Sequence, residues 1–168
     1  IAVATINGHD SSAPREEMLN AGSNPVGYAQ SKWVAEELMR VARERGLPVT
    51  IYQPGRVGSH SQNGAANSND FFVRLLGGCI QVGLAPDIPM VENLVPVDYT
   101  AQAIVELSRQ PALQNQTFHL LNPQPTSWHE VVRMVQGLGY PLQLLPYDDW
   151  YHALSQAAAA ENSQALHS

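Results

Sequence analysis

Tyr28 and Lys32, four residues apart in the run Gly27–Trp33, are the side chains of this sequence most suited to chemistry. Two residues at this spacing share one face of a helix. A phenol has a pKa of about 10, which is too high for efficient proton transfer at neutral pH. An ammonium group one turn away favours the phenolate, as does the positive end of the helix dipole in the first turn. The pair could therefore give a proton to a developing alkoxide.

The spacing alone also fits an ordinary surface contact, so the surrounding elements matter. We expect a strand near Ile1–Thr5, an amphipathic helix over 28–45 and a buried strand over 49–53 that Pro54 ends. Strand, helix and strand in this order imply a right-handed parallel crossover. On the solvent face of the helix, Glu36 and Arg40 are spaced for an ion pair.

Further elements alternate along the rest of the chain and indicate the α/β class. A polar loop is expected over 55–69 and another loop over 86–96. The other expected elements are a helix capped by Asp70 and running to Gln81, a helix over 99–109 capped by Asp98, a strand over 117–121, a helix over 128–136 opened by a Ser127/Glu130 capping box, a strand over 142–145 and a terminal helix from Asp148.

The composition narrows the possible functions. The chain has 168 residues, 44% of them hydrophobic, which fits one globular domain. The net charge is −6 and no basic stripe is present, so nucleic acid is not an expected partner. The single Cys79 rules out an internal disulfide framework and fits a core position in a reducing, cytoplasmic setting. We find no metal-ligand spacing among the His residues and no apolar run of membrane-spanning length.

The sequence has no glycine-rich turn of the G-x-G-x-x-G kind that binds a dinucleotide pyrophosphate. Gly77-Gly78 lies inside an apolar helical run, and Gly137 and Gly139 are followed closely by Pro141. We therefore expect this chain to be one part of a longer enzyme, lacking the cofactor-binding half and inactive by itself.

The runs Tyr28–Glu36 and Gln53–Gly58 resemble those of the extended short-chain dehydrogenase/reductases. More narrowly, the chain resembles the terminal thioester reductase domains of nonribosomal peptide and polyketide synthases, which are relatives of the carboxylic acid reductases. The resemblance covers about residues 24–150. Further matching segments are 59–64, 69–71, 83–86, 95–99 and 118–123.

The resemblance implies the C-terminal part of a Rossmann-like doubly wound sheet with a small substrate-binding α/β portion. Residues 1–58 would end the Rossmann-like core, and residues 59–168 would hold the substrate-binding part with the remaining core elements. The implied roles are Tyr28 as proton donor and cofactor neighbour, and Lys32 as its activator and a ribose contact. The backbone of Pro54, Gly55, Arg56 and Val57 would border the nicotinamide. A substrate-binding Ser or Thr of the family would fall before Ile1, and Thr5 stands too late to replace it.

The implied reaction is reductive release of an acyl or peptidyl thioester from a phosphopantetheinyl carrier protein. NADPH would supply hydride, Tyr28 would protonate the oxyanion, and an aldehyde or alcohol would leave. Two alternatives remain open. One is a sugar-nucleotide epimerase or dehydratase, against which the lack of a basic cluster over 55–70 argues. The other is a non-catalytic module that docks a carrier protein.

Overall fold

The computed structural model describes residues 2–4 and 27–165, and the chain divides into two compact units. The first unit consists of Ile1–Ala65 and Glu92–Pro125. The second consists of Ala66–Val91 and Thr126–Ser168. The chain thus leaves the first unit, builds part of the second, returns, and leaves again.

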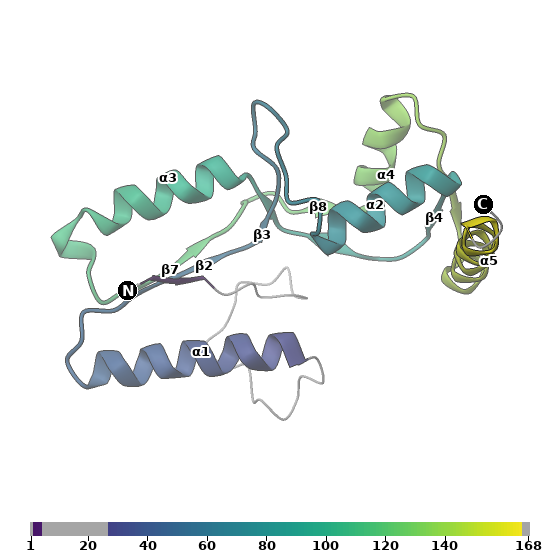
Figure 1. Cartoon of the computed structure of the whole chain (residues 1–168). Coiled ribbons are helices and arrows are strands. Elements are labelled where there is room, and N and C mark those ends of the chain that lie inside the picture. Colours follow the sequence, from purple (N-terminus) through teal and green to yellow (C-terminus); the bar gives the residue numbers. More distant parts are fainter. Residues whose placement is uncertain (1, 5–26, 166–168) are drawn as a thin grey trace. The chain divides into compact units, whose positions relative to one another are not determined.

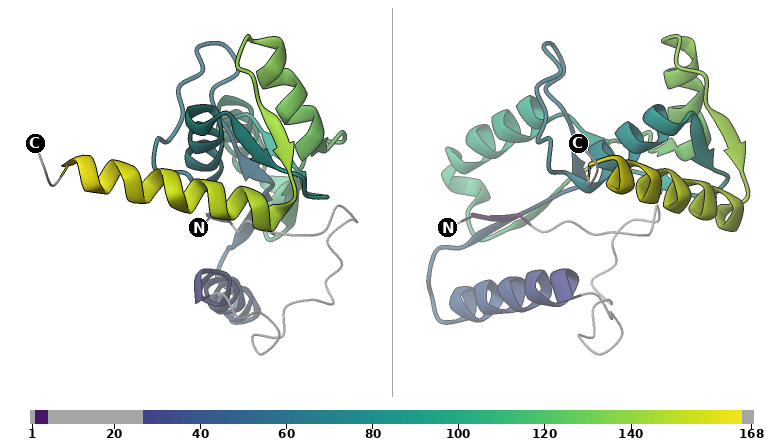
Figure 2. Two further views of the ribbon diagram at one scale, coloured as in Figure 1. Left: turned by 90° about the vertical axis from the view of Figure 1, so that its right-hand side faces the viewer. Right: turned by 45° about the vertical axis from the view of Figure 1, so that its right-hand side comes forward.

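A parallel three-stranded sheet forms the centre of the first unit. Its strands are β1 (Ala2–Ala4), β2 (Thr50–Pro54) and β7 (Thr117–Leu120), in the order β1-β2-β7. Helix α1 (Gly27–Glu44) contacts β1, helix α3 (Val97–Ser108) contacts β2, and the two helices lie on opposite sides of the sheet (Figures 1 and 2). A parallel sheet covered on both faces confirms the α/β, Rossmann-like class.

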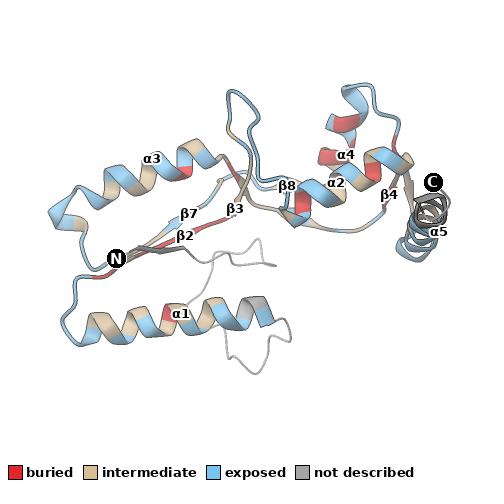
Figure 3. Cartoon of the chain, in the orientation of Figure 1, coloured by how far each residue is buried: buried red, intermediate tan, exposed pale blue. Residues whose placement is uncertain are grey.

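The middle strand β2 is deeply buried (Figure 3). Val49 and Ile51 are 0% exposed, and Tyr52 is 1% exposed. The ring of Tyr52 stacks on Phe118 of β7, with centroids 5.8 Å apart. Burial of β-branched and aromatic side chains on both faces explains why this short run forms a strand between two helices.

The chain changes sheet partners just after β2. Strand β3 (Arg56–Val57) pairs in parallel with β6 (Leu94–Val95), rather than with β7. Both short strands lie in segments that the sequence predicted to be loops, and β5 (Val91–Glu92) lies in the second of them. Two-residue strands carry too little hydrophobic pattern to be recognised from sequence. A short 3-10 helix, Pro111–Leu113, links α3 to β7.

The second unit packs helices around a core centred on Trp128, which is 1% exposed. The indole N–H of Trp128 donates to the carbonyl oxygen of Pro86 at 2.7 Å, and its ring meets Phe72 edge-on at 6.1 Å. Strand β4 pairs in parallel with β9. The elements are α2 (Phe71–Val82), β4 (Leu84–Pro86), β8 (Thr126–Ser127), α4 (Trp128–Gly137), β9 (Gln143–Leu145) and α5 (Tyr147–Ala165).

Two of the three predicted helix caps are present. The carboxylate of Asp70 accepts from the backbone N–H of Phe72 at 2.8 Å, and Ser127 and Glu130 form a complete capping box. The predicted cap at Asp98 is wrong. Helix α3 begins at Val97, so Asp98 is already inside the first turn and Pro96 occupies the cap position.

The ion pair between Glu36 and Arg40 is present at 2.9 Å, but the predicted solvent exposure of Glu36 is wrong. Glu36 is 8% exposed, whereas Leu38 on the same helix is 60% exposed. The charge of the buried carboxylate is compensated by the guanidinium of Arg40, one turn later.

Within the described residues, no helix is long and apolar enough to cross a membrane.

Candidate active site

The predicted catalytic pair lies in the first two turns of α1. The helix begins at Gly27, which makes Tyr28 its second residue and puts Lys32 one turn further on. The backbone of Tyr28 is described and its side chain is not, while Lys32 is half-buried. Thr5 lies outside the described residues. The first turn carries the positive end of the helix dipole, which favours negative charge on a group placed there.

The start of α1 lies at the carboxyl end of the sheet. Helix α1 follows β1 and precedes β2, and these strands are parallel, so the helix must run back along the sheet and begin where the strands end (Figure 1). Pro54, which ends β2, and Gly55, which follows it, are both buried at that same edge. Ligands of open α/β sheets bind outside the carboxyl ends of the strands. Tyr28, Lys32 and the segment Pro54–Val57 therefore belong to the edge where such a site is expected.

Gly55 is the residue at which the chain switches from one strand partner to the other. Its N–H donates to the carbonyl oxygen of Leu120 at 3.0 Å, which extends the β2–β7 ladder by one residue. The N–H of the next residue, Arg56, donates to the carbonyl oxygen of Asn93 at 2.8 Å, which begins the β3–β6 ladder. The backbone predicted to border a nicotinamide is thus fixed on both sides by main-chain hydrogen bonds.

No side chain larger than hydrogen fits at Gly55. A Cβ there would lie 2.5 Å from Oδ1 of Asn93 and would also collide with the Asn93 carbonyl oxygen. Gly55 has no positive φ, so glycine is needed for the close approach rather than for an unusual backbone conformation.

Asn93 and Asn122 are the residues of this region that sequence reasoning missed. The side-chain amide of Asn93 donates to the carbonyl oxygen of Asn122 at 2.8 Å and accepts from its N–H at 2.8 Å. In return, the Asn122 amide donates to the carbonyl oxygen of Leu94 at 3.2 Å. Two Asn residues in loops beside strands carry no distinctive spacing, so their pairing across 29 positions could not be read from the sequence.

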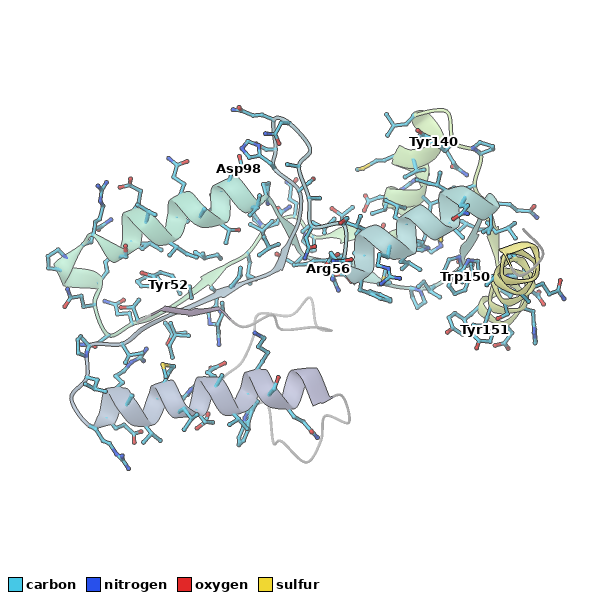
Figure 4. All side chains as sticks on the ribbon, viewed as in Figure 1. Tyr52, Arg56, Asp98, Tyr140, Trp150 and Tyr151 are labelled. Atoms are coloured by element: carbon cyan, nitrogen blue, oxygen red, sulfur yellow. The ribbon has the colours of Figure 1, made fainter. Side chains whose placement is uncertain are left out.

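Arg56, whose backbone is predicted to border the nicotinamide, makes an ion pair through its side chain. Its Nε donates to Oε2 of Glu92 at 2.9 Å, and the two side chains are 23% and 17% exposed. Figure 4 labels Arg56. The pair joins the start of β3 to the residue before Asn93. Partial burial strengthens such a pair relative to one at an open surface.

The polar loop after β3 is held to the start of α3 by Asp98. The Asp98 carboxylate accepts from the backbone N–H of Ser61 at 2.9 Å and from its hydroxyl at 2.6 Å. These hydrogen bonds stabilise the charged form and lower the pKa of Asp98 from 3.8 to about 2. The first part of the loop is therefore anchored, which the sequence did not predict.

Tyr28 and Lys32 lie in the first two turns of the helix that begins at the carboxyl edge of the sheet. In the part of the chain that is described, no group of three or more His, Cys, Asp and Glu side chains could hold a metal ion. Proton transfer from Tyr28, aided by Lys32, is the chemistry that these residue types offer.

Comparison with known proteins identifies what the chain resembles. Residues 3–104 match the model of an NAD-binding family described as male sterility protein. The crystal structure of the terminal R domain from the myxalamid PKS-NRPS biosynthetic pathway superimposes with a TM-score of 0.85 at 42% identity, covering 96% of this chain and 43% of that one.

Two curated relatives are similar over most of this chain. A linear gramicidin synthase protein of Brevibacillus parabrevis is 36% identical over 164 residues, covering 96% of this chain and 3% of that protein. The L-2-aminoadipate reductase large subunit of Eremothecium gossypii is 36% identical over 163 residues, covering 95% of this chain and 12% of that protein. The chain thus spans a small part of the length of these relatives.

Proposed function

The chain belongs to the NAD-binding family described as male sterility protein, and from this membership we propose that it is part of a nicotinamide-dependent thioester reductase. The proposed reaction is the reductive release of an acyl or peptidyl group from a carrier protein. The hydride acceptor is the thioester carbon; its bond to sulfur then breaks, the phosphopantetheine thiol leaves on the carrier, and the first product is an aldehyde.

The observation that carries this proposal is the likeness to the terminal R domain, at 42% identity and a TM-score of 0.85 over 96% of the chain. The names of the relatives point in the same direction, since one is a gramicidin synthase and another an aminoadipate reductase. A shared fold alone would not indicate the reaction, because related folds support many chemistries.

In this proposal Tyr28 is the proton donor and Lys32 its activator. Both lie at the amino end of α1, where the helix dipole favours negative charge on the phenol oxygen. The ammonium of Lys32 has hydrogen-bond donors and no acceptor, so it suits the oxygens of a ribose or of the phenolate. The proton leaves the Tyr28 oxygen as negative charge develops on the substrate oxygen.

The residues present fit a nicotinamide cofactor at the carboxyl edge of the sheet. Buried backbone at Pro54 and Gly55, at the carboxyl end of β2, supports this placement, and in this proposal Lys32 would supply a cation to the ribose. When bound, the cofactor would supply a hydride. The backbone of Pro54–Val57 would border the nicotinamide, limit how far it enters the site and keep water from that side. We propose NADPH as the reductant.

The proposed partner is a phosphopantetheinyl carrier protein. One relative of known structure is a thiolation-reductase di-domain from an archaeal non-ribosomal peptide synthetase, which supports this choice. The buried, single Cys79 fits a reducing compartment, and we propose the cytoplasm.

The test is turnover by the full-length protein that contains this chain. An acyl group is loaded as a thioester on the phosphopantetheine arm of its carrier, NADPH is added, and the released product is identified. We expect NADPH oxidation matched by aldehyde or alcohol. Release of the free acid without NADPH oxidation would overturn the proposal.

A further inference from the structure

The clearest feature that the proposed function leaves unused is the set of hydrogen bonds between Asn93, Asn122 and Leu94 beside Gly55. We call this set the interlock. We propose that these two asparagines are positioning residues for the cofactor, acting through the backbone of Pro54–Arg56. This inference rests on the proposed function, because it assigns a task to the backbone placed there beside the nicotinamide.

The interlock connects the segments beside β6 and β7, the two strands with which the chain pairs on either side of Gly55. Before Gly55 the chain pairs with β7, and after it the chain pairs with β6. Among the described strands, no ladder joins β6 to β7, so their ends would otherwise be independent. The Asn93 side-chain amide accepts from the N–H of Asn122 and donates to its carbonyl oxygen, each at 2.8 Å. A neighbouring strand would bind the same two main-chain groups.

The direction of each bond is fixed by chemistry. A backbone N–H can be satisfied only by an acceptor and a carbonyl only by a donor, so the Asn93 amide has one orientation that fits both. The third bond, from the Asn122 amide to the carbonyl oxygen of Leu94 at 3.2 Å, ties β6 back to the same corner. The partially buried amides leave little freedom for this corner to move.

Gly55 is held against this interlock. Its N–H is bound to the Leu120 carbonyl, and its Cα lies so close to Asn93 that a Cβ would overlap both Oδ1 and the main-chain oxygen. Asn93 therefore limits how closely the backbone at Gly55 can approach it. The carbonyl oxygen of Asn93 also accepts from the N–H of Arg56 at 2.8 Å. Asn93 thus fixes both the position of the backbone at Gly55 and the direction of the chain at Arg56.

The consequence for catalysis is geometric. A displacement of about 1 Å in a group that positions a reactant can lower the rate about a hundredfold. If the Pro54–Arg56 backbone borders the nicotinamide, loosening the interlock changes the cofactor's position without removing any group that touches substrate. Asn93 and Asn122 would then affect cofactor affinity and turnover, although neither takes part in proton transfer.

The test is Asn93→Asp in the full-length protein. The substitution keeps the size of the side chain and one acceptor but replaces the donor to the Asn122 carbonyl with a second acceptor. We expect the KM for NADPH to rise and kcat to fall, each by about tenfold. We also expect faster hydrogen exchange at the Gly55 and Arg56 amides, which is measured without turnover. Asn122→Ala should show a smaller effect in the same direction.

The matched control is Asn115→Ala. The Asn115 side chain accepts from the backbone N–H of Val49 at 2.9 Å, at the other end of the same β2 region. Asn115 also has a φ of 61°, so alanine there is strained and should cost stability. We expect this variant to melt at lower temperature with the KM for NADPH unchanged.

The outcomes separate the two proposals. If the wild-type protein reduces the thioester but Asn93→Asp changes only the melting temperature, the positioning role is wrong and the proposed function stands. Unchanged exchange at Gly55 and Arg56 would overturn the interlock's role even if turnover changed. A wild-type protein with no NADPH-dependent reduction would overturn both.

Discussion

The carboxylate of Asp98 binds both the backbone N–H and the hydroxyl of Ser61, 37 residues earlier in the chain, at 2.9 and 2.6 Å. The contact joins the loop after β3 to the first turn of α3. It is reinforced by a main-chain hydrogen bond of 3.4 Å from Val97 to the Ser59 carbonyl oxygen. The first residues of the loop after β3, Ser59 and Ser61, are therefore held to the start of α3, where Figure 4 labels Asp98.

This contact predicts a pH-dependent stability. The pKa of Asp98 in the folded chain is about 2, below its ordinary 3.8, because the Ser61 hydroxyl and N–H stabilise the charge. A lowered pKa contributes stability above pH 3.8, and this contribution is lost as the pH falls toward about 2. We expect the difference in melting temperature between wild type and Asp98→Asn to shrink over that interval. Ser61→Ala should raise the pKa of Asp98, measured by NMR titration. A melting difference that stays constant with pH would contradict this account.

Gly55→Ala should destabilise the protein by about 1–3 kcal/mol, because the added methyl overlaps Asn93 where both segments are held by hydrogen bonds. The matched control is Gly77→Ala. A Cβ at Gly77 meets nothing within 4 Å, and the residue lies inside α2, so alanine should stabilise by about 0.5–1 kcal/mol. Urea unfolding gives both values. Equal effects of the two substitutions would contradict the close approach at Gly55.

Cys79 should be almost unreactive in the folded protein. It is 1% exposed, and burial raises the pKa of its thiol to about 11, despite an opposing contribution from Trp150. At pH 7 only about one thiol in 10⁴ would be the reactive thiolate. We expect a thiol reagent such as DTNB to react slowly with native protein and at once in denaturant. Rapid labelling of the native protein would mean that α2 opens readily from its core.

Ser127→Ala should cost about 1 kcal/mol, because it removes the hydroxyl that caps α4 and one side of the capping box. The control is Ser108→Ala at the exposed end of α3, where the hydroxyl only donates to the Val105 carbonyl oxygen. We expect little change there. If both variants unfold at the same urea concentration as wild type, the capping box contributes nothing measurable.

The long elements could be predicted from sequence because each carries a local signal. The apolar spacing over 28–45 predicted the helix that forms as α1, although Val34, Leu38 and Val41 are exposed, and the Ser127 and Glu130 capping box predicted α4. The parallel β1-α1-β2 crossover followed from the order of these elements. The resemblance to thioester reductase domains was read from ordered short runs and is confirmed.

What the sequence could not supply are the contacts that depend on tertiary structure. Asp98 looked like a cap because Asp is a common cap residue, yet α3 starts earlier and Ser61 is its partner. The β3–β6 pairing and the Asn93–Asn122 interlock join segments about 30 or more residues apart, for which no local pattern exists. The burial of Glu36 depends on the packing of α1 and has no local signal either.

The most direct test of the proposed catalysis is Tyr28→Phe in the full-length protein, measured as single-turnover reduction of a carrier-bound thioester by NADPH. Loss of the proton donor should lower the rate by about 10²–10⁴-fold, with binding of NADPH and carrier unchanged. The control is Tyr52→Phe. The Tyr52 hydroxyl is buried without a hydrogen-bond partner among the described residues, so its removal should leave the rate as it is. A Tyr28→Phe protein that reduces the thioester at the wild-type rate would contradict the assignment of Tyr28 as the acid.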